Sequence, residues 1–219
     1  MAKKYTLPNQ KNLKKKSTDL LLIFTRNPEL GKCKTRLAAT TGDQIALEIY
    51  KFLLEHTVKI TEELSVEKQV YYSETIWKDD VWNEEFYTKK LQQGIDLGER
   101  MKNAFENGFK SGFNKIIIIG SDMYDLSDTD IKKAFAVLNK TDYVLGPAED
   151  GGYYLLGMKK LKDELFNDKA WGTGNVLKDT LMNLKNEKYS MLEERNDVDL
   201  FEDIQDHDAF QPFFKNLRK

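Results

Sequence analysis

Short, continuous apolar runs that alternate with helical patterns are the feature of this chain that most constrains its fold. Residues 20–24 and 116–119 are wholly apolar, as is typical of strands that are buried on both faces of a sheet. Apolar residues recur at helical spacing over residues 43–64 and 97–110, which predicts two amphipathic helices. Strands that alternate with helices indicate an α/β fold with a mainly parallel central sheet.

Weaker patterns predict the remaining elements. We expect strands at residues 69–73, 86–92, 142–145 and 153–158, and helices at residues 128–139, 175–186 and 199–210. In open parallel sheets, ligands bind at the carboxyl ends of the strands. The loops that follow the two most apolar strands should therefore meet at one edge of the sheet.

Composition narrows the function classes. The net charge is −2, so no overall field favours nucleic acid, and we expect no nucleic-acid partner. A single cysteine, Cys33, excludes an internal disulfide and predicts a reducing compartment, the cytoplasm. No apolar run is long enough to span a membrane.

The chain length of 219 residues fits one medium-sized domain. We expect a Lys-rich tail at residues 1–17 and a single domain over residues 18–219. The tail lacks the apolar stretch of a secretory signal. Binding of the tail to an anionic surface is the alternative to a solvated tail.

A basic loop follows the first strand and carries Arg26, Lys32, Lys34 and Arg36. Arginine offers a forked donor for phosphate oxygens and lysine a mobile point charge, so such a loop at a strand end can clamp a diphosphate. The single Gly31 fits neither a P-loop nor a G-x-G-x-x-G motif. The alternative interpretation is a solvated basic turn.

Carboxylates follow two other elements. Asp122 lies where the Ile-rich strand ends, and Asp125 lies three residues further on, where a turn role suits it better. Mg²⁺ takes one or two carboxylates together with phosphate oxygens, which Asp122 could complete. Asp197 and Asp199 form a second acidic pair, for which helix capping is the alternative. Two histidines and one cysteine leave no zinc site.

The segment 146–154 places Asp150, Gly151 and Gly152 between two strand-like runs. Glycines let a backbone turn sharply or approach a ligand closely. Asp-Gly between apolar runs is also a strong hairpin signal. The segment is therefore either part of a binding site or a plain turn.

Taken together, these motifs resemble the DUF2064 family, whose members are assigned as GT-A-type glycosyltransferases, often radical-SAM/selenodomain-associated or linked to arsenosugar biosynthesis. Residues 28–37 resemble its P-x-x-G-x-x-K-T-R-L loop, residues 93–101 its Q-x-G-x-D-L-G-E-R-M segment, residues 120–122 its G-[ST]-D-x-P element, residues 146–154 its G-P-A-x-D-G-G-Y block, residues 171–173 its Trp-containing segment and residues 197–199 its D-[VI]-D-T segment. The likeness runs from about residue 20 to residue 204. Tyr124 and Leu200 depart from the pattern, since they stand where the family has Pro and Thr.

The resemblance implies a nucleotide-diphospho-sugar transferase fold of the GT-A, Rossmann-like type. It implies a metal-dependent glycosyltransferase that moves a sugar from a nucleotide-diphosphate donor to a small acceptor. The expected site has Lys32, Lys34, Arg36, Arg100, Gly151 and Gly152 binding substrate, Asp122 and Asp199 holding Mg²⁺ or Mn²⁺, and Asp150 as the catalytic residue. The alternatives are a nucleotidyltransferase that joins a nucleoside triphosphate to a phosphorylated small molecule, and a non-catalytic nucleotide-sugar binding module.

Overall fold

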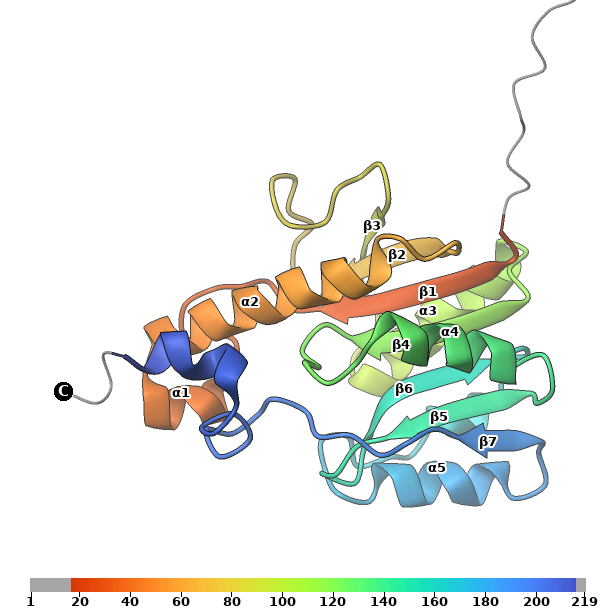
Figure 1. Cartoon of the computed structure of the whole chain (residues 1–219). Helices are drawn as coiled ribbons and strands as arrows, with labels where there is room; N and C mark the ends of the chain where they lie inside the picture. Colours follow the sequence, from red (N-terminus) through yellow and green to blue (C-terminus); the bar gives the residue numbers. More distant parts are fainter. Residues whose placement is uncertain (1–16, 216–219) are drawn as a thin grey trace, which may run out of the picture.

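A seven-stranded sheet with helices on both faces forms the centre of the molecule (Figure 1). The computed structural model describes residues 17–215, so the expected Lys-rich tail lies outside the described residues except for Ser17. The strands are β1 (Asp19–Thr25), β2 (Glu67–Tyr72), β3 (Thr88–Leu91), β4 (Lys115–Gly120), β5 (Tyr143–Pro147), β6 (Tyr153–Met158) and β7 (Tyr189–Met191), in the order β3-β2-β1-β4-β6-β5-β7. The helices are α1 (Thr35–Thr41), α2 (Asp43–Thr61), α3 (Leu97–Lys110), α4 (Asp128–Val137) and α5 (Val176–Leu184), with 3₁₀ turns η1 (Asp163–Leu165) and η2 (Asp208–Phe214).

The sheet is mainly parallel, which confirms the predicted α/β fold. Strand β6 runs antiparallel to its neighbours β4 and β5, and the other strand pairs within residues 17–215 are parallel. In register, Ile118 of β4 pairs with Leu22 of β1 on one side and Leu156 of β6 on the other. The ends of β1, β4 and β5 and the start of β6 therefore share one edge, which we call the carboxyl edge.

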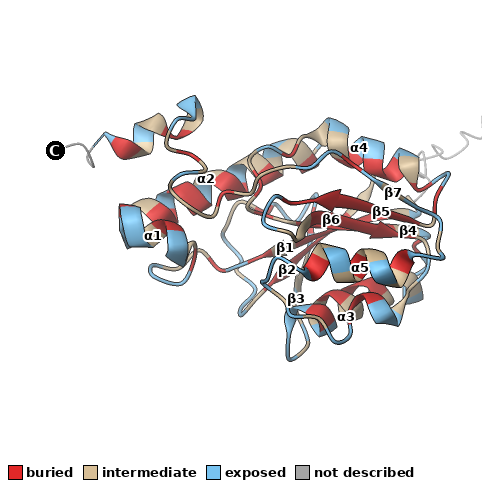
Figure 2. Cartoon of the chain, turned by 90° about the horizontal axis from the view of Figure 1, so that it is seen from below, coloured by how far each residue is buried: buried red, intermediate tan, exposed pale blue. Residues whose placement is uncertain are grey.

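Two helices cover each face of the sheet. Helices α2 and α4 lie on one face and α3 and α5 on the other (Figure 2). Strand residues alternate between the two cores, so that Leu21 and Ile117 pack in the first and Leu22 and Ile116 in the second. Full burial of each such side chain contributes about 1.5–3 kcal/mol. The apolar character of both faces explains why these strands have continuous apolar sequences.

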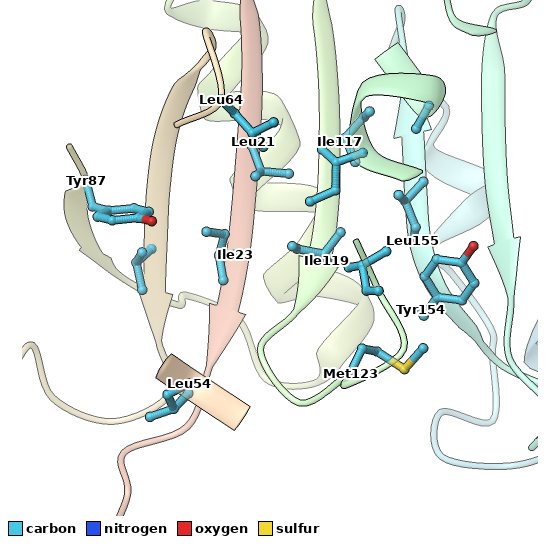
Figure 3. Close-up of a cluster of buried hydrophobic side chains, with 14 of the residues drawn as sticks. Leu21, Ile23, Leu54, Leu64, Tyr87, Ile117, Ile119, Met123, Tyr154 and Leu155 are labelled. Atoms are coloured by element: carbon cyan, nitrogen blue, oxygen red, sulfur yellow. The ribbon is translucent and has the colours of Figure 1, made fainter. Parts of the chain in front are cut away.

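The first core extends to the carboxyl edge, where Met123 and Tyr154 lie beside Ile119 and Leu155 (Figure 3). Met123 and Tyr154 are nearly fully buried. Since each of them neighbours a loop of the edge in sequence, the core fixes the base of those loops. The loops are thus anchored rather than free.

Capping residues set the helix starts that the sequence predicts. The Asp96 side chain accepts a hydrogen bond from the Glu99 N–H at 2.8 Å at the start of α3. Ser127 and Asp130 form a reciprocal capping box at the start of α4. Each cap satisfies backbone donors that the first turn leaves unpaired.

Two predicted elements differ from the structure. The basic loop is shorter than expected, because α1 begins at Thr35 directly after Lys34, whose backbone is left-handed with φ 49°. The helix predicted at residues 199–210 is wrong. The Asp203 side chain accepts the N–H groups of Asp199 and Leu200 at 2.9 and 2.6 Å, and this local turn competes with a helix.

A third apolar cluster lies beyond the end of the sheet and joins α1, α2 and η2 (Figure 1). Leu37, Ile49, Leu53 and Phe210 are fully buried in it. This cluster holds the C-terminal segment against α2, and that segment carries Asp197 and Asp199 past the carboxyl edge. None of the helices described between residues 17 and 215 has the length and apolar character needed to cross a bilayer.

Candidate active site

An ion pair between two loops lies at the centre of the carboxyl edge. Lys34 Nζ donates to Asp122 Oδ2 at 2.8 Å. The Lys34 side chain is only 6% exposed, whereas that of Asp122 is 41% exposed. The loops after β1 and β4 therefore meet, and they present an accessible carboxylate over a buried cation.

Lys34 and Asp122 each stabilise the ionised form of the other. Burial acts to lower the pKa of Lys34, but the carboxylates of Asp122, Asp199 and Asp197 outweigh it and keep that pKa above its ordinary value. Burial acts to raise the pKa of Asp122, but the charge and hydrogen bond of Lys34, with a further contribution from Arg26, keep that pKa below its usual range. Both groups are therefore charged at neutral pH.

Hydroxyl groups beneath the pair tie the two loops together. The Tyr50 hydroxyl accepts the Arg26 N–H at 2.9 Å and lies 3.3 Å from both Thr25 Oγ1 and Ser121 Oγ. Ser121 donates to Thr25 Oγ1 at 3.0 Å. Local sequence patterns do not predict this network, because Tyr50 lies in the middle of a helix and its tertiary position brings it to the edge.

Cations line a pocket of about 670 Å³ on one side of Asp122, which we call the outer pocket. Four of the predicted binding residues lie along it, together with Arg26; they are Lys32, Lys34, Arg36 and Arg100. Arg100, on α3, donates from Nε to the Gly94 carbonyl at 3.1 Å. The structure therefore brings the basic loop and α3 to the same cavity.

Carboxylates already neutralise part of this basic surface. Arg36 Nη1 lies 2.5 Å from Asp199 Oδ2, and Lys32 pairs with Glu29 at 2.7 Å. The Arg36 side chain is 65% exposed. An anion that enters the outer pocket can therefore bind the Arg36 guanidinium in place of Asp199, because that contact is not buried.

Cys33 lies in the wall of the outer pocket but is not primed to react. Its side chain is buried, and burial raises the pKa of the thiol despite the nearby charges of Lys34 and Arg26. The thiolate is the reactive form. We therefore expect Cys33 to take no part in the chemistry.

A second cavity of about 260 Å³, the inner pocket, lies on the other side of Asp122. Asp122, Phe24 and Leu97 line both pockets. The inner pocket also contains the carboxylates of Asp150 and Asp197, with aromatic and apolar walls. The two pockets thus meet at Asp122 and differ in charge.

Asp150 lies both in a hairpin turn and in the wall of the inner pocket, so the two interpretations of its segment do not exclude each other. Strands β5 and β6 pair antiparallel on either side of it. Asp150 Oδ1 accepts the Gly152 N–H at 2.8 Å. The residue is exposed, and the carboxylate lines the same cavity as Asp122.

The two glycines of this turn have different roles. Gly151 has φ +84°, and a Cβ there would lie 2.3 Å from the Gly174 carbonyl oxygen, so the fold itself requires glycine. A Cβ on Gly152 would meet mainly the Asp150 carboxylate, 3.0 Å away. Gly152 lines the inner pocket, whereas Gly151 does not.

Asp197 is a residue of the inner pocket that the expected site omits. Burial and the negative charges of Asp150 and Asp122 raise the pKa of Asp197 to about 6, although the Lys34 charge opposes this. The family resemblance implies Asp199, the second carboxylate of the pair, as the metal ligand. The local sequence pattern does not predict whether Asp197 or Asp199 lines the inner pocket, because that depends on the path of their segment past the carboxyl edge.

Arg195 fixes the segment that carries Asp197. Its guanidinium donates to the Asp125 carbonyl and to Asp130 Oδ1, both at 2.8 Å. Its backbone pairs with Pro147 and Glu149, next to Asp150. One side chain therefore links the loop after β4, the start of α4 and the segment of Asp197.

The carboxylates at this edge would hold a divalent ion together with oxygen atoms from a bound phosphate compound. No three His, Cys, Asp or Glu side chains within residues 17–215 come together as a metal cage. Mg²⁺ commonly binds one or two carboxylates and completes its shell with phosphate oxygens and water. Asp122 and Asp197 match that donor set, because both line the inner pocket and Lys34 pairs with Asp122 through Oδ2 alone. Asp199 lines the outer pocket instead, where it is paired with Arg36.

Comparisons with solved structures support the fold. A provisionally assigned nucleotide-diphospho-sugar transferase from Desulfovibrio desulfuricans G20 is 29% identical, with a TM-score of 0.79 over 92% of this chain and 94% of that one. A cytidylyltransferase from Leptospira borgpetersenii is 13% identical, with a TM-score of 0.54 over 85% and 83% of the two chains. The 4-diphosphocytidyl-2C-methyl-D-erythritol synthase from Anaerococcus prevotii is 8% identical, with a TM-score of 0.52 over 92% and 97%. The last two likenesses concern the fold alone.

Sequence comparison gives the family. A search of curated proteins found no significant match. The family model described as "uncharacterized protein conserved in bacteria (DUF2064)" matches residues 57–173, which include Arg100, Asp122 and Asp150. The chain therefore belongs to the DUF2064 family and has the fold shared by nucleotide-diphospho-sugar transferases and cytidylyltransferases.

Proposed function

We propose that this protein is a metal-dependent glycosyltransferase that moves a sugar from a nucleotide-diphosphate donor to a small acceptor. The observation that carries the proposal is the partition of charge about Asp122. Cations line the outer pocket on one side, and carboxylates line the inner pocket on the other. A nucleotide-sugar donor matches this partition, because its anionic diphosphate suits the cationic outer pocket and its uncharged sugar suits the inner pocket.

In this proposal the outer pocket binds the diphosphate. Arg36 and Arg26 are exposed at its wall and offer forked donors, while Lys34 lies beneath with its charge fixed by Asp122. These groups stabilise the charge that grows on the departing nucleoside diphosphate, which is where electrostatic catalysis acts. When bound at Asp122 and Asp197, a divalent ion would supply further neutralisation of the same oxygens.

The inner pocket then holds the reacting sugar and the acceptor hydroxyl. Asp150 Oδ1 is held by the Gly152 N–H, which leaves Oδ2 available to the cavity. In this proposal Asp150 accepts the proton of the acceptor hydroxyl as that oxygen attacks. Arg100 extends the cationic wall on the side of α3.

The alternative, a nucleotidyltransferase, draws support from the cytidylyltransferase-like fold. It would place a triphosphate in the outer pocket and a phosphorylated molecule in the inner pocket. A third possibility is a non-catalytic nucleotide-sugar binding module, which would bind a donor without turning it over.

A thermal-shift panel separates these functions. We expect a nucleoside diphosphate or its sugar to raise the melting temperature in Mg²⁺ or Mn²⁺, with release of the nucleoside diphosphate on incubation with an acceptor. Stabilisation by a triphosphate with release of pyrophosphate would establish the nucleotidyltransferase instead. Stabilisation without any product would indicate the binding module.

A further inference from the structure

We infer that the inner pocket selects a second substrate rich in hydrogen-bond donors, a hydroxyl or amino compound without phosphate or carboxylate groups. This inference rests on the proposed function, because it assigns the substrate class of the same site. It concerns only the acceptor side of that site. Its basis is the set of charges, donors and apolar surfaces that line the cavity.

The inner pocket contains negative side chains and no basic ones. Asp122, Asp150 and Asp197 line it, and no lysine, arginine or histidine does so among residues 17–215. Lys34 lines the outer pocket instead and is paired with Asp122. Asp150 forms no ion pair with any described residue. Lys34 and the divalent ion of the proposed function would compensate Asp122 and Asp197, which leaves the charge of Asp150 without a partner. A phosphate or carboxylate group beside Asp150 would therefore be repelled.

The hydroxyl donors of the inner pocket are already used within the protein. The Tyr154 hydroxyl donates to the Glu193 carbonyl at 3.0 Å, and the Thr173 hydroxyl donates to the Ala170 carbonyl at 2.8 Å. The Tyr153 hydroxyl points to Met101 Sδ at 3.9 Å. The pocket consequently offers carboxylate acceptors and few donors, and a ligand must supply the donors itself.

Apolar and aromatic surfaces form the rest of the wall. Phe24, Leu97, Met101 and Trp171 line the cavity. The Trp171 ring packs directly on the start of α3, since a Cβ at Gly98 would lie 2.6 Å from Trp171 Nε1. An apolar wall lowers the local dielectric and so strengthens repulsion between like charges. It also suits the C–H face of a sugar-like ring.

This composition disfavours the nucleotidyltransferase alternative on the acceptor side. That reaction needs a phosphorylated second substrate, and the inner pocket provides no basic side chain to bind the phosphate. A hydroxyl group can instead donate to Asp150, and an amine can donate with added charge complementarity. The carboxylate oxygens of Asp150, which repel phosphate, therefore favour hydroxyl and amino groups.

Binding of three matched sugars to the full chain tests the inference. We would follow the indole N–H signal of Trp171 by NMR, assigned with Trp171→Phe, while titrating glucosamine, glucose and glucose 6-phosphate. Glucosamine should bind most tightly and glucose 6-phosphate least. Asp150→Asn keeps an oxygen for the Gly152 N–H but removes the charge. It should weaken glucosamine binding by about tenfold, because a charge-assisted hydrogen bond is roughly twice as strong as a neutral one.

Glu149→Gln is the matched control, since Glu149 is the exposed neighbour of Asp150 and lines neither pocket. It should leave the order and the affinities unchanged. The inference is overturned if glucose 6-phosphate binds as tightly as glucosamine, if no sugar shifts the Trp171 signal, or if both variants lose affinity equally. Failure of nucleoside diphosphates to bind the outer pocket would instead refute the proposed function, whatever the order of the sugars.

Discussion

Lys34 Nζ lies 2.8 Å from Asp122 Oδ2 although the two residues are 88 positions apart in the sequence. The contact joins the loop that begins the cationic wall to the loop that ends the Ile-rich strand. It places a fixed positive charge beneath the point where the outer and inner pockets meet. The site is therefore assembled by the fold before any ligand binds, and its parts can be tested one at a time.

Asp122→Asn should remove the metal dependence of nucleotide binding. The variant lacks the negative charge of Asp122 that would bind the metal. It also leaves Lys34, whose side chain is 6% exposed, without its counter-charge. Because Asp122 itself is partly exposed, we expect the free energy of unfolding to fall by only about 1–2 kcal/mol. Titration of a nucleoside diphosphate with Mg²⁺ and with chelator measures the first effect, and urea unfolding measures the second.

Asp79→Asn, an exposed aspartate in neither pocket, is the control for that variant. It should bind nucleotide and unfold as the unaltered chain does. An Asp122→Asn protein whose affinity still responds to Mg²⁺ in full would show that Asp122 is not the metal ligand.

Arg36→Ala should weaken binding of nucleoside diphosphates by roughly ten- to a hundredfold, since it removes charge-assisted hydrogen bonds worth about 1.5–3 kcal/mol. A nucleoside without phosphates should bind equally to both proteins. Calorimetric titration in excess Mg²⁺ gives both affinities. Unchanged diphosphate affinity would mean that Arg36 is no part of a clamp.

Asp199→Asn separates two roles of the neighbouring carboxylate. In the structure Asp199 holds Arg36, so its removal should preserve or raise diphosphate affinity by freeing the guanidinium. If Asp199 instead holds the metal, as the sequence resemblance implies, the affinity should fall and lose its dependence on Mg²⁺. The same titration distinguishes the two results.

Asp197→Asn should stabilise the metal-free protein, and more so at higher pH. The pKa of Asp197 is raised to about 6 in the folded state, above the value of about 4 that is usual for aspartate. Between those values the folded state binds more protons than the unfolded state, so the unaltered chain loses stability as the pH rises through this window. The asparagine variant cannot ionise and escapes that loss.

The stability difference between the two proteins should therefore grow from about pH 4 to about pH 6 and stay constant above, at about 1–3 kcal/mol. Urea unfolding in chelator over this pH range measures it. A difference that does not vary with pH would show that Asp197 titrates normally. Asp206→Asn, an exposed aspartate outside both pockets, provides the baseline.

The sequence predicted those parts of the fold that depend on local pattern. The bounds of α3 match the expected residues 97–110, and β4 contains the apolar run 116–119, because periodicity and capping act within a few residues. The meeting of Lys34 and Asp122 at one edge also followed, since loops after parallel strands share that edge. By contrast, the start of α1 depends on the left-handed backbone of Lys34, and the role of Asp197 depends on a segment held by Arg195. These are tertiary features that no local pattern encodes.

Substitutions at Gly151 and Gly152 should separate the turn from the site. Gly151→Ala should lower the melting temperature, because φ is +84° there and the new Cβ would lie 2.3 Å from the backbone of Gly174. Gly152→Val should instead press on the Asp150 carboxylate, which is the flexible end of a side chain and can move aside. We expect Gly152→Val to reduce ligand binding in the inner pocket, followed through the Trp171 signal, more than it lowers the melting temperature. Equal losses in both measurements for Gly152→Val would mean that residues 150–152 act only as the turn of a hairpin.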